Sequence, residues 1–145
     1  MKSSSAARRK ARRFVLQALY QVEMTGDSAI VVEQQFRAEK EMQGTDMAYF
    51  HELLSGTMQH RTPLLESIGP LSNRKLEELD PVEKAILLIG SFELTHRVEI
   101  PYRVVISEAV ELAKKFGATE SHRFINSVLD ALAKINRQYE LDKSN

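Results

Sequence analysis

The sequence predicts an all-α protein, a compact bundle of about seven helices. Apolar residues recur at a spacing of three or four over most of the chain, which is typical of helices with one buried face. Residues that start or stop helices separate these apolar stretches. Sustained alternation of apolar and polar residues, which would indicate strands, does not occur in the sequence. With 145 residues, of which 43% are hydrophobic and 28% charged, the chain is long enough to bury a core.

Three helices are expected in the first part of the chain. The first runs from about residue 8 to residue 24, because apolar residues from Phe14 onward keep helical spacing and Gly26 follows as a stop. The pair Asp27-Ser28 precedes a second apolar stretch, and the pair Thr45-Asp46 precedes a third. Side chains of these types accept a backbone N–H at helix N-termini, so each pair predicts a helix start.

The segment from Asp80 to Leu94, DPVEKAILLIGSFEL, gives the clearest helix signal. Asp80 suits the N-cap, Pro81 suits the first helical position, and Glu83 completes a capping-box arrangement. The apolar run that follows leaves no polar face, which predicts a central helix buried on all sides. Gly90 inside this helix costs about 1 kcal/mol relative to alanine, which indicates that another backbone passes close to it.

Three further helices complete the predicted bundle. The pair Thr62-Pro63 has the form of an N-cap followed by proline and predicts a short helix that ends near Gly69-Pro70. Pro101 opens a longer helix whose C′ position falls on Gly117. The last helix begins at Thr119-Glu120 and carries apolar residues at helical spacing.

Basic residues concentrate at the start of the chain. Residues 1–13 contain no acidic residue and hold six of the 20 basic ones: Lys2, Arg8, Arg9, Lys10, Arg12 and Arg13. The dipole of a helix disfavours cations at its N-terminus, so this cluster indicates that an anion binds there. We therefore expect a flexible basic arm over residues 1–13, suited to a phosphate backbone or an anionic membrane. A solvated, disordered terminus is the alternative.

The rest of the chain is acidic. Beyond residue 13 there are 14 basic and 20 acidic residues, a net charge of −6. We expect residues 14–145 to form a single helical domain, and its charge favours a second partner that is itself basic.

Several functional classes lack their sequence signature. The chain has no cysteine, which excludes disulfides and thiolate metal sites. It has neither a signal-peptide pattern nor an apolar run of transmembrane length, so we expect a cytoplasmic protein with no membrane partner. Glu93 and His96 form one Glu-x-x-His pair, whereas a di-iron bundle needs two such pairs and two further glutamates. Nucleophile and phosphate-loop motifs are absent too, so we expect no catalysis, metal site or cofactor.

The first predicted helix has a basic face, formed by Arg9, Arg13, Gln17 and Tyr20. At 100° per residue these side chains lie within about 80° of one another, on the side away from Ala18 and Leu19. An aromatic ring beside guanidinium groups is typical of single-stranded RNA binding, where cations contact phosphates and a base stacks on the ring. Packing of Tyr20 against the next helix is the alternative. RNA is favoured over a membrane, because the arm has no apolar anchor before Phe14.

Four segments of the sequence resemble the NusB family of bacterial transcription antitermination factors. They are VLQALYQVEM, LEELDPVEKAILLI, VISEAVELAKKFG and SHRFINSVLDAL, and the last two stand in the order and at the spacing of the family. The likeness extends from Arg8 to about Leu132. It implies two packed helical subdomains, no catalytic activity, binding to the single-stranded boxA element of ribosomal RNA leaders, and a heterodimer with the ribosomal protein NusE. Such assemblies join RNA polymerase and suppress premature termination.

The resemblance also implies roles for individual residues. Its arginine-rich arm matches Arg8, Arg9, Lys10, Arg12 and Arg13. Tyr20 and Phe124 match aromatic positions on the RNA side, and Glu77 and Glu83 match acidic positions on the NusE-facing side. A purely structural role is the alternative for two of them, because Phe124 borders the apolar stripe of its helix and Glu83 is a capping residue.

The chain departs from the family pattern in three places. Leu88 stands where an arginine is common, Gly90-Ser91-Phe92 replaces a more usual Ala-x-Tyr stretch, and Ser127 replaces a glycine. These departures concern packing and oligomeric state. The same domain also occurs in front of ribosomal RNA methyltransferases, but 145 residues leave no room for a methyl-donor domain. The remaining alternative is a non-catalytic protein-interaction module with a disordered basic tail, and salt-sensitive RNA binding would distinguish the two.

Overall fold

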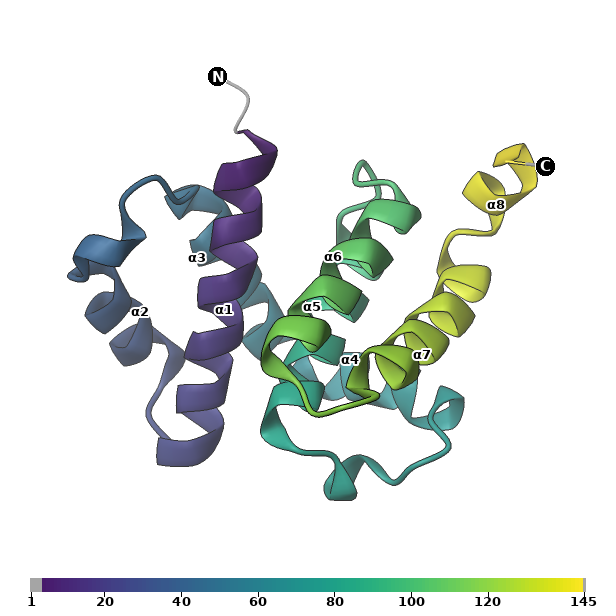
Figure 1. Cartoon of the computed structure of the whole chain (residues 1–145), viewed down its shortest axis with the longest axis horizontal. Coiled ribbons are helices and arrows are strands. Elements are labelled where there is room, and N and C mark those ends of the chain that lie inside the picture. The colour runs from purple at the N-terminus through teal and green to yellow at the C-terminus, as the bar shows by residue number, and fades with distance from the viewer. Residues whose placement is uncertain (1–3, 145) are drawn as a thin grey trace. The chain divides into compact units, whose positions relative to one another are not determined.

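The computed structural model describes residues 4–144, and over this range the chain is helical without any strand. Eight α-helices and three short 3-10 helices follow one another, which confirms the all-α prediction with one α-helix more than expected. The chain divides into two compact units, residues 1–59 and 60–145, as the two subdomains implied by the resemblance require. Figure 1 colours the first unit purple to blue and the second teal to yellow. No helix in the described range is long and apolar enough to cross a membrane.

The first unit contains three α-helices: α1 (Ser5–Thr25), α2 (Ala29–Arg37) and α3 (Met47–Gln59). A 3-10 turn, η1 (Lys40–Met42), lies between the last two. Both predicted caps are confirmed, because Ser28 Oγ accepts from Val31 N and Asp46 Oδ1 accepts from Tyr49 N. Helix α1 packs against α2 and α3, so its apolar side forms the centre of this unit.

Three aromatic rings join the helices of the first unit. Phe14 of α1 meets Phe36 of α2 edge to face at 6.3 Å between ring centroids, and Phe36 stacks on Phe50 of α3 at 6.0 Å. Such aromatic pairs contribute about 0.5–1.5 kcal/mol beyond the area they bury. Helices α1 and α2 are also joined by an exposed hydrogen bond, in which Gln21 Nε2 donates to Gln35 Oε1 at 2.6 Å.

Helix α1 begins earlier than predicted. Ser4 is its N-cap and its hydroxyl accepts from Ala7 N at 3.0 Å, so the helix starts at Ser5 rather than near residue 8. The helix continues through residue 13 without a break. The expected boundary between an arm and a domain is therefore not a boundary in secondary structure, and Lys2 lies outside the described residues.

The second unit contains the other five α-helices. They are α4 (Arg61–Ile68), α5 (Pro81–His96), α6 (Tyr102–Phe116), α7 (Ser121–Asn136) and α8 (Gln138–Ser144). Two 3-10 turns, η2 (Gly69–Leu71) and η3 (Leu76–Glu78), lie between α4 and α5. Helix α5 packs against α4, α6 and α7, and α6 packs against α7, so α5 is the central helix of this unit.

The prediction of a fully buried central helix is confirmed. All residues from 85 to 94 are buried, and Asp80 caps the helix by accepting from Glu83 N at 2.8 Å. The other end of α5 is closed by Arg137, which the sequence analysis did not single out. The buried Arg137 guanidinium donates to four backbone carbonyl oxygens, those of Glu93, Leu94, Arg97 and Ile100. It also pairs with the Glu140 carboxylate at 2.7 Å, so both the carbonyls and the buried charge are satisfied.

One predicted helix start is wrong, and one correctly placed helix end, at Gly117 after α6, has another conformation than expected. Helix α4 begins at Arg61, with His60 in the N-cap position, so Thr62 is not its cap. Gly117 has φ −87° and ψ 175°, which is extended backbone rather than the left-handed conformation expected at C′. Space explains this glycine instead, because a Cβ atom there would lie 2.7 Å from the carbonyl oxygen of Ala113.

Gly90 allows a close approach, but the neighbour is a side chain and not the backbone that was expected. A Cβ atom at Gly90 would lie 2.6 Å from Cδ1 and 3.0 Å from Cδ2 of Leu129 on α7. Leu129 is itself fully buried, so it cannot turn away without disturbing other core residues. The glycine thus sets how closely α7 packs on α5.

Gly90→Ala should therefore lower the free energy of unfolding by about 1–3 kcal/mol, because overpacking outweighs the gain in helix propensity. In a Leu129→Ala background the same change should instead stabilise the protein by up to about 1 kcal/mol, since the clash is gone. Urea unfolding of the four proteins measures both effects. Stabilisation by Gly90→Ala in the wild-type background would contradict this account.

Candidate functional site

The predicted basic face of α1 is confirmed as a solvent-facing surface. Arg9, Gln17 and Tyr20 are exposed and Arg13 is half-buried, whereas the apolar side of the helix is buried. Tyr20 is 42% exposed, so part of this residue is accessible to a ligand, and packing against the next helix with the hydroxyl outward stays the alternative. The face thus offers two guanidinium groups, an amide and an aromatic ring to solvent.

Three other cations of the basic segment, Arg8, Lys10 and Arg12, contact residues of the first unit. The Arg8 and Arg12 guanidinium carbons lie 4.8 Å and 5.6 Å from the centroid of the Tyr49 ring, a cation–π arrangement. Lys10 Nζ donates to the carbonyl oxygen of Gln43. Arg12 is only 4% exposed, so among the five cations expected to bind RNA this one is buried in the first unit. At 100° per residue Arg8 and Arg12 lie on the same side of the helix as Leu19, so the burial of Arg12 and the partial burial of Arg8 follow from their position.

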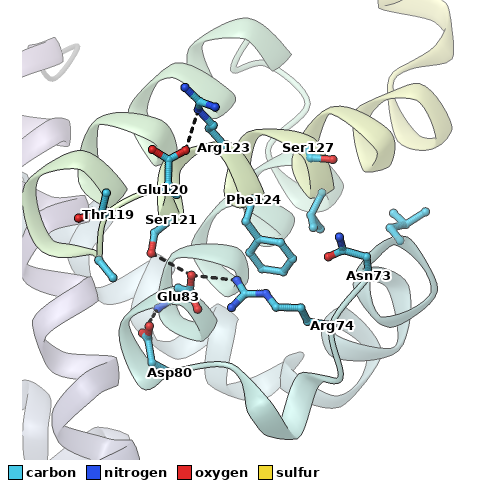
Figure 2. A pocket seen from close by; sticks show the side chains of 13 residues that line it. Asn73, Arg74, Asp80, Glu83, Thr119, Glu120, Ser121, Arg123, Phe124 and Ser127 are labelled. Carbon is cyan, nitrogen blue, oxygen red and sulfur yellow. Dashed lines mark hydrogen bonds and ion pairs between the residues drawn. The ribbon is translucent and has the colours of Figure 1, made fainter.

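The second unit joins Phe124 and Glu83 through a residue that the sequence analysis did not identify. Arg74, in the segment before η3, places its guanidinium carbon 3.9 Å from the centroid of the Phe124 ring on α7. Arg74 Nη2 also donates to Glu83 Oε2 at 2.9 Å, and Ser121 Oγ donates to the same oxygen at 2.9 Å. Figure 2 shows this network, with Arg74 between the ring and the carboxylate. The predicted RNA-side aromatic and one predicted partner-side acid are therefore connected by one cation.

A cavity of about 600 Å³ opens beside this network. Its charged and aromatic lining consists of Arg74, Asp80, Glu83, Glu120, Arg123 and Phe124. Asn73, Ser121 and Ser127 add amide and hydroxyl groups, so the lining offers both donors and acceptors. Ser127, which replaces a glycine of the family pattern, thus adds a hydroxyl to this lining.

Glu83 is buried, which fits the alternative of a structural role, and its place on the NusE-facing side stays a prediction. Its side chain is 6% exposed, whereas Glu77 on η3 is exposed to solvent. Burial raises the pKa of Glu83, but hydrogen bonds from Arg74 and Ser121 and the charge of Arg74 outweigh it and hold the pKa below its ordinary value. Glu83 is therefore a charged residue that positions Arg74.

Arg74 and Ser121 carry no signal that a single sequence reveals. Arg74 lies in a segment without helical periodicity, nine residues before Glu83, and Ser121 lies 38 residues after it. What could have indicated them is the buried position of Glu83 on the first turn of a helix with no polar face, because a buried carboxylate needs donors.

Glu93 and His96 occupy different surroundings. Glu93 is buried, whereas His96 is exposed and stacks on His60 with 4.5 Å between ring centroids. Partial burial and the charge of His60 lower the pKa of His96. Within residues 4–144, no group of three or more potential metal ligands is present.

Comparison with known proteins gives a consistent family match. Residues 9–134 match the profile of the NusB family. The transcription antitermination protein NusB of Shewanella halifaxensis is 48% identical over 130 residues, which are 90% of this chain and 96% of that protein. NusB of Saccharophagus degradans is 48% identical over 143 residues, which are 98% of this chain and 95% of that protein.

Solved structures share the fold. T. maritima NusB superposes with a TM-score of 0.75 at 27% identity, over 92% of this chain and 93% of that one. A second structure, of the antitermination factors NusB and NusE in complex with double-stranded RNA, has a TM-score of 0.75 at 23% identity, over 91% of this chain and 99% of that one. At this identity the second likeness shows the fold alone.

The Glu83 network should make stability depend on pH in a defined direction. Because the pKa of Glu83 is lowered on folding, its contribution is complete above the ordinary value of 4.5 and is lost as the pH falls below it. Glu83→Gln should lower the free energy of unfolding by about 1–3 kcal/mol at pH 7, and the difference from wild type should shrink below pH 4.5.

Urea unfolding of both proteins between about pH 3 and pH 7 tests this expectation, because the ordinary pKa of a glutamate lies within this range. Glu77→Gln, which changes an exposed residue of η3, is the control and should keep wild-type stability at pH 7. A constant difference between wild type and Glu83→Gln across the range would contradict the assignment.

Proposed function

Since the chain belongs to the NusB family, we propose that it is a transcription antitermination factor that binds RNA together with the ribosomal protein NusE. The RNA is the single-stranded boxA element of ribosomal RNA leaders, and the assembly joins RNA polymerase in the cytoplasm. The protein binds and positions its partners without a catalytic step of its own. A protein of the same fold was crystallised with NusE and RNA, which is consistent with this pairing.

The basic face of α1 is the observation that carries the RNA-binding proposal. Arg9 and Arg13 present guanidinium groups that suit phosphates, and the exposed ring of Tyr20 gives a base a surface for stacking. Gln17 between them adds an amide that can donate to or accept from a base edge. Arg8, Lys10 and Arg12 contribute positive potential and hold the helix in place.

The network around Arg74 supports a second RNA contact in the other unit. Arg74 covers one face of the Phe124 ring, so the pair offers an aromatic surface and a cation side by side. We propose that RNA engages this pair and that Glu83 acts by orienting Arg74 rather than by touching NusE directly. Glu77, which is exposed, is then the acidic residue that contacts the basic partner.

The alternative function is a protein-interaction module that does not bind RNA. It also fits the acidic composition of residues 14–145, but it gives no reason for two arginines and a tyrosine on one exposed helix face. Salt-dependent RNA binding distinguishes the two functions, because each phosphate contact releases counterions.

Arg9→Gln/Arg13→Gln should flatten the dependence of RNA affinity on salt. For single strands the slope of log K against log salt changes by about 0.7 for each lost phosphate contact. Fluorescence titration of a boxA-type RNA at several salt concentrations measures the slope, with a scrambled RNA beside it. Lys115→Gln, an exposed cation of α6, is the control and should keep the slope. A double variant with the wild-type slope would refute the phosphate assignment.

Tyr20→Ala should weaken RNA binding by about 1–3 kcal/mol and leave the salt slope nearly unchanged, since it removes a stacking surface and no charge. Tyr20→Phe keeps the ring and should retain most of the affinity. Thermal melts of both variants are needed beside the titrations. If Tyr20→Ala loses affinity only where it is partly unfolded, the tyrosine is a packing residue.

Glu77→Lys should weaken the complex with NusE by on the order of tenfold, or about 1.4 kcal/mol, through repulsion of a basic partner. Binding of RNA and of NusE should also be reciprocal, so that each tightens the other by the same factor. Calorimetry in both orders of addition measures the coupling, and Glu66→Lys on α4 is the control for an exposed acid elsewhere. Intact NusE affinity in Glu77→Lys, or the absence of any coupling in both orders of addition, would count against this arrangement.

A further inference from the structure

A second cavity lies in the first unit, and the proposed function gives it no role. Its volume is about 320 Å³. Helix α1 contributes Phe14, Gln17 and Gln21, helix α2 contributes Gln35 and Phe36, and the segment around η1 contributes Glu39 and Glu41. The cavity therefore combines aromatic rings, three amides and two carboxylates.

The chemistry of this lining is that of a base-binding site. The edge-to-face pair Phe14 and Phe36 gives an apolar wall for a flat ring. The bond from Gln21 Nε2 to Gln35 Oε1 uses one donor and one acceptor. Each amide carries two donors and an acceptor with two lone pairs, so hydrogen-bonding capacity remains on both.

The cavity adjoins the basic face of α1. Gln17 belongs to both surfaces, and Arg13 lies one helical turn before it. The Arg13 guanidinium carbon is 5.3 Å from the centroid of the Phe14 ring, so a cation stands beside the aromatic wall. An RNA strand whose phosphate contacts Arg13 would have a base within reach of the cavity.

We propose that this cavity receives one base of the RNA bound along α1 and that it favours guanine. The proposal rests on the proposed function, because it needs an RNA on the basic face. The carboxylates of Glu39 and Glu41 only accept hydrogen bonds at neutral pH, so they favour a base that presents donors. Guanine presents N1–H and N2–H side by side, which match the two oxygens of one carboxylate, and its O6 can accept from a glutamine amide.

The other bases fit this lining less well. Uracil presents one donor between two carbonyl oxygens, and these oxygens repel a carboxylate. Adenine and cytosine each present an amino group next to an unprotonated ring nitrogen, so only one oxygen of the carboxylate is satisfied. A basic side chain of a protein partner is disfavoured, because the Arg13 guanidinium already lies beside Phe14.

The test uses the full chain and short single-stranded RNAs titrated at low salt. One RNA is all uridine, and three others carry a guanosine, an inosine or an adenosine at one central position. We expect the guanosine RNA to bind about tenfold more tightly than the all-uridine RNA. Inosine stacks as guanosine does but lacks the N2 amino group, so most of this preference should be lost with it.

Glu39→Ala/Glu41→Ala separates base recognition from simple charge effects. Removal of two acids weakens repulsion of phosphate, so the variant should bind all-uridine RNA at least as tightly as wild type. It should nevertheless lose most of the preference for guanosine. Glu66→Ala/Glu78→Ala, which removes two exposed acids from the second unit, should keep that preference.

Each remaining outcome would overturn the proposal. Equal binding of the uridine and guanosine RNAs, with normal salt dependence, removes the base site and leaves the proposed function intact. If Glu39→Ala/Glu41→Ala keeps the guanosine preference but binds NusE more weakly, the cavity binds a side chain of NusE and not a base. Failure of the wild-type chain to bind either these RNAs or a boxA-type RNA, with or without NusE, refutes the proposed function and this inference together.

Discussion

Burial of α5 on every side is the constraint from which the second unit follows. A helix without a polar face needs both ends satisfied by the protein, and Asp80 and Arg137 do this. The same burial encloses Glu83 on the first turn, and a buried carboxylate needs donors. Arg74 supplies one, and in that position its guanidinium lies over the ring of Phe124. The proposed second RNA contact, at Arg74 and Phe124, is thus a consequence of how the central helix is buried.

The first unit uses the two sides of one helix for different purposes. Arg8 and Arg12 lie four residues apart on the side that packs on Tyr49, where their cations stabilise the fold. Arg9 and Arg13 also lie four residues apart, on the side that faces solvent. These four arginines, which form one basic stretch in the sequence, therefore lie on two different sides of the helix. Arg12 of the first pair is buried, whereas Arg9 of the second pair is exposed and Arg13 is half-buried.

The features that could be predicted from the sequence are those with local causes. Helical periodicity and capping residues such as Ser28, Asp46 and Asp80 predicted the main helices. Both depend on residues only three or four positions apart. The features that were missed depend on contacts between distant residues. Arg137 binds carbonyls more than 40 positions earlier, and Ser121 reaches Glu83 across 38 positions. Buried acids and arginines find such partners only after the helices are assembled, so periodicity cannot indicate them.

The hydrogen bonds of Arg137 also affect when the second unit can fold during protein synthesis. The carbonyl oxygen of Leu94 leaves the ribosome 43 residues before the guanidinium that satisfies it. Until Arg137 has emerged, the carbonyl oxygens at the C-terminal end of α5 must accept hydrogen bonds from water. This end of the helix cannot be buried before then. The first unit is complete once residue 59 has been made, and domains generally fold in the order of their synthesis. In that order of folding, the cationic surface of α1 forms before the helices of the second unit have been synthesised.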